Sequence, residues 1–99
     1  MLYTIRTTPT FAAWFARLRD RAAKRQIEAR VDRLAHGNAG QHRVLTGGIA
    51  ELKLDLGPGY RLYYTYRNGH VILLLCGGNK ASQQQDIRRA RGLAAGLEE

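Results

Sequence analysis

Apolar and polar residues alternate along the second half of the chain, which is the pattern of strands with one buried face. The clearest run places Leu52, Leu54 and Leu56 between charged residues. The strands expected from this pattern cover residues 43–46, 49–56, 60–67 and 71–76. Short glycine-containing turns separate them, so we expect four consecutive antiparallel strands. A further strand is expected at 2–7, where Tyr, Thr and Ile favour extended backbone.

The dipeptide Asn68-Gly69 predicts a two-residue hairpin turn, because type I′ turns need positive φ at both central positions. Such a turn places Arg67 opposite His70 and fixes the register of the two long strands. Leu62 and Tyr64 then share a core face with Leu73 and Leu75. The opposite face carries a row of cations and hydroxyls that is suited to binding an anion: Arg61, Tyr63, Thr65 and Arg67. Gly47-Gly48 is expected to form a second two-residue turn.

Three segments show the apolar spacing of amphipathic helices. The first follows Thr8-Pro9, which reads as N-cap and first helical residue. The second runs from Arg21 to about His36 after a capping Asp20, and Gly37 suits its C-terminal end. The third runs from Gln83 to about Leu97, with Ser82 and Gln85 matching a capping box. The apolar stripes comprise Phe11, Trp14, Phe15 and Leu18, then Ala23, Ile27, Val31 and Leu34, then Ile87, Ala90, Leu93, Ala94 and Leu97.

The expected order of elements is β-αα-ββββ-α, which defines an α+β fold. We expect one domain over residues 1–99, with a mostly antiparallel sheet packed on the N-terminal helix pair and a C-terminal helix. The helix pair should cover the face that carries Leu52 and Leu62. The opposite face of the sheet is then expected to be open, at least in part, for function.

The chain has 99 residues and a net charge of +8, and 13 of its 16 basic residues are arginine. Arginine binds phosphate in a bidentate manner, so this balance favours a polyanionic partner, nucleic acid first. A basic surface that serves solubility or an acidic protein partner is the alternative. No apolar run has the length of a membrane span, and the N-terminus lacks a signal-peptide pattern, so we expect a cytoplasmic protein. The single Cys76 excludes an internal disulfide and a cysteine-based zinc cluster.

Two motifs carry a resemblance to a known family. Residues 57–61 read Gly-Pro-Gly-Tyr-Arg, and residues 77–83 read Gly-Gly-Asn-Lys-Ala-Ser-Gln. With them the whole chain resembles the RelE/ParE superfamily of toxins, and more closely its HigB-like, phage-derived Gp49-like branch of addiction module killer proteins. The resemblance implies a RelE-like fold and a toxin that cuts mRNA in the ribosomal decoding site without a metal or other cofactor. It also implies an antitoxin, usually a helix-turn-helix protein, through which the complex reaches operator DNA.

The resemblance also implies residue roles. Arg61 matches the arginine of the family's Gly-Tyr-Arg motif, and it is expected to hold the scissile phosphate and stabilise transition-state charge. Lys80 matches a basic position that similar toxins use at that phosphate. Apart from the resemblance, the place of Lys53 on the polar face of the neighbouring strand suits it to contact the backbone phosphate or to act as a base. The family often has a tyrosine on the last helix, which this chain replaces with Gln84, Gln85 and Asp86.

Asp86 has two interpretations: a general base, or a partner of the helix dipole and of Lys80. We expect Tyr63, Arg67, Gln83 and Arg88 to contact RNA, with Tyr63 stacking on a base. For Arg61 the structural alternative is an ion pair with Glu51 or Asp55. The three histidines have no suggestive spacing and are interpreted as solvated, with His42 alone kept open as a site candidate: His36, His42 and His70.

Two other functions stay open at this stage. A ParE-type toxin has the same fold but inhibits DNA gyrase, so fold does not separate the two. A non-catalytic nucleic-acid-binding module would use the same cations as ordinary phosphate contacts.

Overall fold

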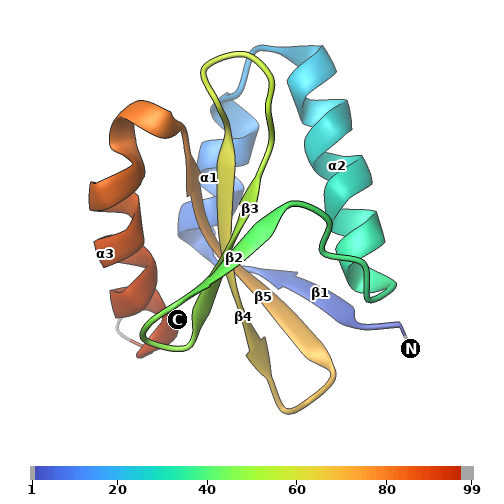
Figure 1. Ribbon diagram of the computed structural model, residues 1–99, viewed down its shortest axis with the longest axis vertical. Coiled ribbons are helices and arrows are strands. Elements are labelled where there is room, and N and C mark those ends of the chain that lie inside the picture. The colour runs from blue at the N-terminus through green and yellow to red at the C-terminus, as the bar shows by residue number, and fades with distance from the viewer. Residues whose placement is uncertain (1, 97–99) are drawn as a thin grey trace.

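The computed structural model describes residues 2–96 of the chain, and the expected Leu97 lies outside these described residues. A five-stranded sheet separates two helices on one face from one helix on the other (Figure 1). The elements are β1 (Thr4–Thr7), α1 (Pro9–Arg17), α2 (Arg21–Ala35), β2 (His42–Leu45), β3 (Ile49–Lys53), β4 (Arg61–Arg67), β5 (Val71–Gly78), the 3-10 helix η1 (Lys80–Ser82) and α3 (Gln83–Ala94). The predicted order and the α+β class are confirmed.

The strand order in the sheet is β1-β5-β4-β3-β2. Strands β2 to β5 form the predicted antiparallel meander, and β1 adds a parallel edge strand beside β5. The connection from β1 to β5 passes through both helices and the meander. Strands β1 and β5, which are far apart in the sequence, therefore lie side by side in the sheet.

The predicted caps of the first two helices are confirmed. Thr8 accepts a hydrogen bond from the Phe11 amide at 3.0 Å, and Asp20 accepts one from the Ala23 amide at 3.0 Å. The Thr8 hydroxyl also donates to the Leu75 carbonyl at 2.6 Å. This buried residue therefore starts α1 and fastens it to β5 at the same time.

Two apolar clusters lie on opposite faces of the sheet. The cluster beneath α1 and α2 contains the predicted core residues Leu52, Leu62 and Tyr64, together with Phe11 and Ile27. The second cluster lies beneath α3 and contains Ile49, Tyr63, Leu73, Leu75, Cys76, Ala90 and Leu93. The face expected to be open is therefore covered by α3 over much of its area, and only its remaining part is accessible.

The predicted hairpin register is wrong by one residue. Asn68 and Gly69 do have positive φ, at 56° and 74°, but Arg67 pairs with Val71 and the loop spans residues 68–70. A β-bulge between Tyr63 and Tyr64 changes the pairing again farther along the strands. Because a one-residue slip exchanges the faces of a strand, Leu73 and Leu75 lie beneath α3 instead of beside Leu62. The Gly47-Gly48 turn likewise belongs to a three-residue loop, since Leu45 pairs with Ile49.

The start of the last helix also differs from the prediction. Asn79, and not Ser82, forms the capping box: its side chain accepts from the Ser82 amide, and the Ser82 hydroxyl accepts from the Asn79 amide. These contacts cap the single turn of η1, which leads into α3. The expected box with Gln85 is wrong because Ser82 is already inside this turn.

Replacement of Gly77 by alanine is expected to lower the free energy of unfolding by about 1–3 kcal/mol. A Cβ at this position would lie 2.4 Å from two ring atoms of Trp14, which packs on the backbone of β5. Urea denaturation of the purified variant measures the loss. In the double variant Trp14→Leu/Gly77→Ala the smaller side chain makes room, so its loss should be less than the sum of the single losses. Strictly additive losses would contradict the steric explanation.

Candidate functional site

A polar cleft of about 380 Å³ opens on the part of the sheet that α3 leaves uncovered. Strands β2, β3 and β4 and the first residue of α3 supply its walls. Its lining residues are Gln41, His42, Arg43, Glu51, Lys53, Arg61 and Gln83. Three of them are permanent or near-permanent cations, so the cleft is suited to an anionic ligand.

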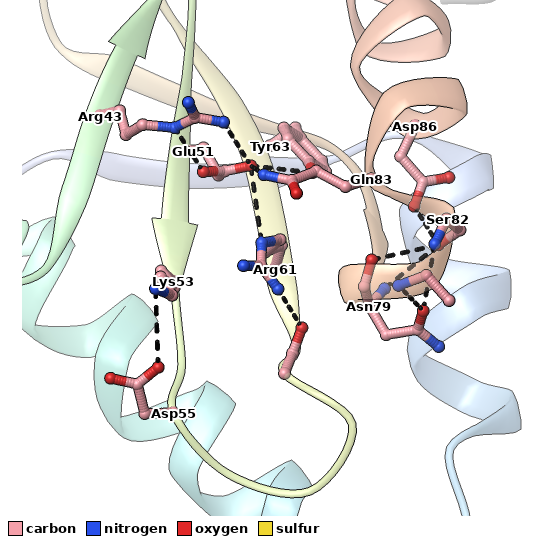
Figure 2. Close-up of polar contacts among 12 residues, drawn as sticks. Arg43, Glu51, Lys53, Asp55, Arg61, Tyr63, Asn79, Ser82, Gln83 and Asp86 are labelled. Carbon is pink, nitrogen blue, oxygen red and sulfur yellow. Dashed lines mark hydrogen bonds and ion pairs between the residues drawn. The ribbon is translucent and has the colours of Figure 1, made fainter.

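Glu51 lines this cleft and is the centre of a network of hydrogen bonds (Figure 2). Its side chain is 2% exposed, and its carboxylate accepts hydrogen bonds from Arg43 Nε at 2.9 Å, Tyr63 Oη at 3.0 Å and Gln83 Nε2 at 3.0 Å. Burial alone would raise the pKa of Glu51, but the bonds from Arg43, Gln83 and Tyr63 outweigh it and lower the pKa. Glu51 is therefore ionised, and it joins three separate elements of the fold.

Arg61 lies beside this carboxylate with a side chain only 6% exposed. Its Nη1 donates to the Gly59 carbonyl at 2.7 Å, and its Nε lies 3.9 Å from Glu51 Oε2, where it is buried without a hydrogen-bond partner. Nη2 has no hydrogen bond to the described residues, yet it is not among their buried unpaired atoms. The guanidinium is therefore held from one side and presents Nη2 to the cleft.

The other two expected cations border this arginine. Lys53 lines the cleft and makes a loose, half-exposed ion pair with Asp55 at 3.9 Å. Lys80 is exposed and lies outside the cleft, beside Gly59. A Cβ on Gly59 would be 3.0 Å from Arg61 Nη1 and 3.4 Å from the Lys80 Cβ, and Gly59 itself has a φ of +79°. Glycine thus allows the loop to pass between Lys80 and Arg61.

Asp86 does not join the cleft. Its Oδ2 accepts a hydrogen bond from the Ser82 hydroxyl at 2.5 Å, and a Cβ on Gly78 would collide with this carboxylate. Figure 2 shows Asp86 and Ser82 pointing away from Glu51, whereas Gln83 reaches toward it. No ion pair joins Asp86 to Lys80 within residues 2–96. This placement favours the structural interpretation of Asp86, as a residue that holds the start of α3 on β5.

The structure corrects the expectation for Tyr63. Its side chain is fully buried beneath α3, so its ring cannot stack on a base in this conformation. Burial, the nearby Glu51 charge and the hydrogen bond to Glu51 all raise the pKa of Tyr63, which keeps the phenol protonated as a donor. Tyr63 therefore helps to hold the Glu51 carboxylate in place through this hydrogen bond.

Arg67 lies at the opposite end of β4 from Arg61, six residues and about 20 Å along an extended strand. Its Nη2 donates to the Ala94 carbonyl at 2.7 Å, near the C-terminal end of α3, where a cation is favourable. Arg88 is exposed and lines a separate hollow with Lys80, Gln84 and Gln85. Of the four expected RNA contacts, the cleft contains Gln83.

Sequence reasoning missed Arg43 and gave Glu51 only the role of an ion-pair partner for Arg61. The pairing of Arg43 with Glu51 across β2 and β3 brings their side chains together. The available signal was Ile49, an apolar residue two positions before Glu51 and therefore on the same strand face. His42 also lines the cleft, and its Nδ1 lies 2.8 Å from the Gly40 carbonyl oxygen.

Stability should fall more steeply in acid for the wild type than for Glu51→Gln. The folded-state pKa of Glu51 lies below its ordinary value of 4.5. The stability that ionised Glu51 adds to the folded state is therefore fully present above pH 4.5. The contribution is lost as the pH falls through the lowered folded-state pKa. Urea denaturation between about pH 7 and pH 3 measures this. Parallel curves for both proteins would show that Glu51 has the same pKa when folded and unfolded.

Among the described residues, no group of three or more His, Cys, Asp or Glu side chains is placed to hold a metal ion. No helix in residues 2–96 is both long enough and apolar enough to cross a membrane.

The fold of the chain is similar to that of RelE. A mutant of the Escherichia coli toxin RelE, in the free state, superimposes with a TM-score of 0.69 and 19% sequence identity, over 90% of this chain and 98% of that one. The predicted RelE-like fold is thereby confirmed. No model of a known protein family matches the sequence.

An uncharacterized protein of Haemophilus influenzae is 44% identical over 97 residues, which cover 98% of each chain. The chain belongs to the same family as this Haemophilus influenzae protein.

Proposed function

We propose that the protein is the toxin of a toxin–antitoxin module, of the HigB-like kind, and that it cuts mRNA on the ribosome. The observation that carries this proposal is Arg61: a buried guanidinium, fixed by Gly59 and Glu51, with Nη2 open to a cationic cleft. The RelE-like fold and the net charge of +8 support it.

Cleavage of an RNA phosphodiester without a metal requires two proton transfers and stabilisation of the phosphate charge, and the proposal assigns these roles to residues in or beside the cleft. The 2′-oxygen attacks phosphorus and loses its proton, while the bond to the 5′-oxygen breaks and that oxygen takes a proton. Arg61 is assigned to the phosphate, whose added negative charge it stabilises because its position is fixed before the substrate binds. Guanidinium is too weak an acid to exchange protons, so Lys53 and Lys80, at the two edges of Arg61, are assigned to proton transfer.

Glu51 is assigned a positioning role. Its carboxylate oxygens accept hydrogen bonds from three residues and its pKa is lowered, so it is a poor proton acceptor. It instead orients Arg43, Arg61 and Gln83 around the cleft. Asp86 is left outside this scheme because it holds the start of α3.

The partners proposed for this function are the ribosome with its mRNA, and an antitoxin with a helix-turn-helix domain that carries the complex to operator DNA. The proposed compartment is the cytoplasm, where translation takes place.

Two assays on the purified protein test the proposal against the main competing function. A reconstituted translation reaction should stop when the protein is added, and gyrase should continue to supercoil relaxed plasmid. Inhibition of gyrase with undisturbed translation would instead identify a ParE-type toxin. A protein that binds RNA and stops neither reaction would be a binding module.

A further inference from the structure

A guanidinium from α2 binds the backbone at the end of the cleft where β2 and β3 separate. Arg30 extends from α2, which covers the other face of the sheet (Figure 1). Its Nη1 donates to the Lys53 carbonyl at 2.8 Å, and its Nη2 donates to the Gln41 carbonyl at 2.9 Å and the Ala39 carbonyl at 3.2 Å. Because Lys53 and Gln41 line the cleft, one side chain outside the cleft holds two of its residues.

The bond to Lys53 replaces a hydrogen bond of the β-ladder. His42 pairs with Leu52, so Gln41 and Lys53 would form the next pair along the two strands. In a hydrogen-bonded antiparallel pair, each amide donates to the carbonyl of the opposite residue. The Lys53 amide does donate to the Gln41 carbonyl at 3.1 Å, but the Lys53 carbonyl accepts from Arg30 instead of from the Gln41 amide. Arg30 thus ends the pairing of β2 with β3 at a defined residue.

The loop before β2 is shaped to receive this guanidinium. Gly40 has a φ of +62°, and a Cβ on Gly40 would lie 3.3 Å from Arg30 Nη2. Glycine therefore lets the loop approach closely enough for the carbonyls on both sides of it to bind Arg30. Arg33, exposed on the same helix, differs in this respect, since its side chain makes no hydrogen bond or ion pair with residues 2–96.

The Lys53 side chain depends on this backbone contact for its position. Lys53 pairs with Arg61 across β3 and β4, and both side chains line the cleft. Its ion pair with Asp55 is long, at 3.9 Å, and exposed, so it holds the ammonium only weakly. Proton transfer requires the donor and the acceptor at hydrogen-bond distance, so a small shift of the Lys53 backbone lowers the rate.

We propose that Arg30 is a positioning residue for the cleavage reaction, which acts through the backbone of Lys53 and does not touch the RNA. This inference rests on the proposed function, in which Lys53 is assigned to proton transfer. Loss of Arg30 should therefore lower the cleavage rate at saturating protein. The protein concentration that gives half of the maximal rate should stay the same, because the cations that face the cleft remain.

The test is a double-mutant cycle of Arg30→Ala and Lys53→Ala. Cleavage of one defined message on translating ribosomes is measured over a range of protein concentrations, for long enough to follow the slow variants. Arg30→Ala should lower the saturated rate about 10-fold or more. In the Lys53→Ala background the same substitution should lower it less than about twofold, because the side chain through which Arg30 acts is already absent.

Arg33→Ala is the matched control, since it removes the same charge from the same helix and should keep the wild-type rate. If Arg30→Ala does not fold, Arg30→Lys takes its place in the cycle. Its single ammonium cannot reproduce the forked contact, so its smaller loss should also disappear in the Lys53→Ala background.

Three results would overturn the positioning role and leave the proposed function standing. They are a wild-type rate in Arg30→Ala, the same fold-loss with and without Lys53, and a raised half-saturating concentration at an unchanged maximal rate. A folded wild-type protein that does not cut the message would overturn both the positioning role and the proposed function.

Discussion

Replacement of Arg61 by alanine is expected to abolish growth arrest and to lower the rate of mRNA cleavage at least about 100-fold. The side chain is almost completely buried, Nη1 is held by Gly59, and Nη2 opens into the cleft. Arg61→Lys should also be strongly impaired, because one ammonium cannot occupy both the Gly59 site and the cleft. Colony formation under induction and primer extension on a reporter message measure the two effects.

Arg67→Ala is the matched control for this prediction. It removes the same charge from the other end of the same strand, where the guanidinium bonds to Ala94 and not to the cleft. This variant should remain toxic, with a modest loss of stability from the weakened end of α3. Equal loss of toxicity in Arg61→Ala and Arg67→Ala would contradict a localised site and would indicate that total charge alone matters.

Replacement of Glu51 by alanine is expected to lower the free energy of unfolding by about 3–5 kcal/mol, the largest stability effect predicted here. The substitution removes the acceptor of Arg43, Tyr63 and Gln83 and leaves the Arg61 charge buried without its neighbouring carboxylate. The Tyr63 hydroxyl, fully buried, would lose its hydrogen bond altogether. Urea denaturation at neutral pH measures the loss.

Asp55→Ala provides the comparison, since Asp55 is also an acidic residue beside a basic one in the same region. Its side chain is 68% exposed and its ion pair with Lys53 is long, so the expected loss is below about 0.5 kcal/mol. A Glu51→Ala protein as stable as Asp55→Ala would show that the hydrogen bonds of Glu51 do not hold β2, β3, β4 and α3 together.

The sequence predicted the order of the elements because its local signals agree with the final structure. Thr8-Pro9 and Asp20 start helices whose apolar stripes pack on the sheet. Leu52 and Leu62 lie on the buried face that strand alternation predicts. These features depend on side-chain spacing and on hydrogen bonds within a few residues.

The register of β4 and β5 could not be predicted in the same way. Asn68 and Gly69 adopt the expected positive φ, but the loop contains one more residue and a bulge follows at Tyr63 and Tyr64. Both change which residues of β5 face α3, and local side-chain spacing does not report such contacts between distant segments. The wrong prediction for Leu73 and Leu75, which lie beneath α3, follows from this difference in register.

The residues that line the cleft were predicted only in part, for the same reason. Arg61, Lys53 and Gln83 meet in the cleft, and Lys80 borders it. Tyr63 alternates with core residues just as an exposed residue would, so its burial beneath α3 is invisible to strand periodicity. The contribution of Arg43 required the β2–β3 pairing, which places it directly opposite Glu51.

The most direct test of the proposed function is cleavage of one defined mRNA by purified protein with purified ribosomes, followed by primer extension, with wild type beside Arg61→Ala. We predict in-frame cuts with the wild type only when ribosomes are translating the message, and none with the variant. An intact message in the presence of folded wild-type protein, or equal cutting by Arg61→Ala, would contradict an mRNA-cleaving site at the cleft.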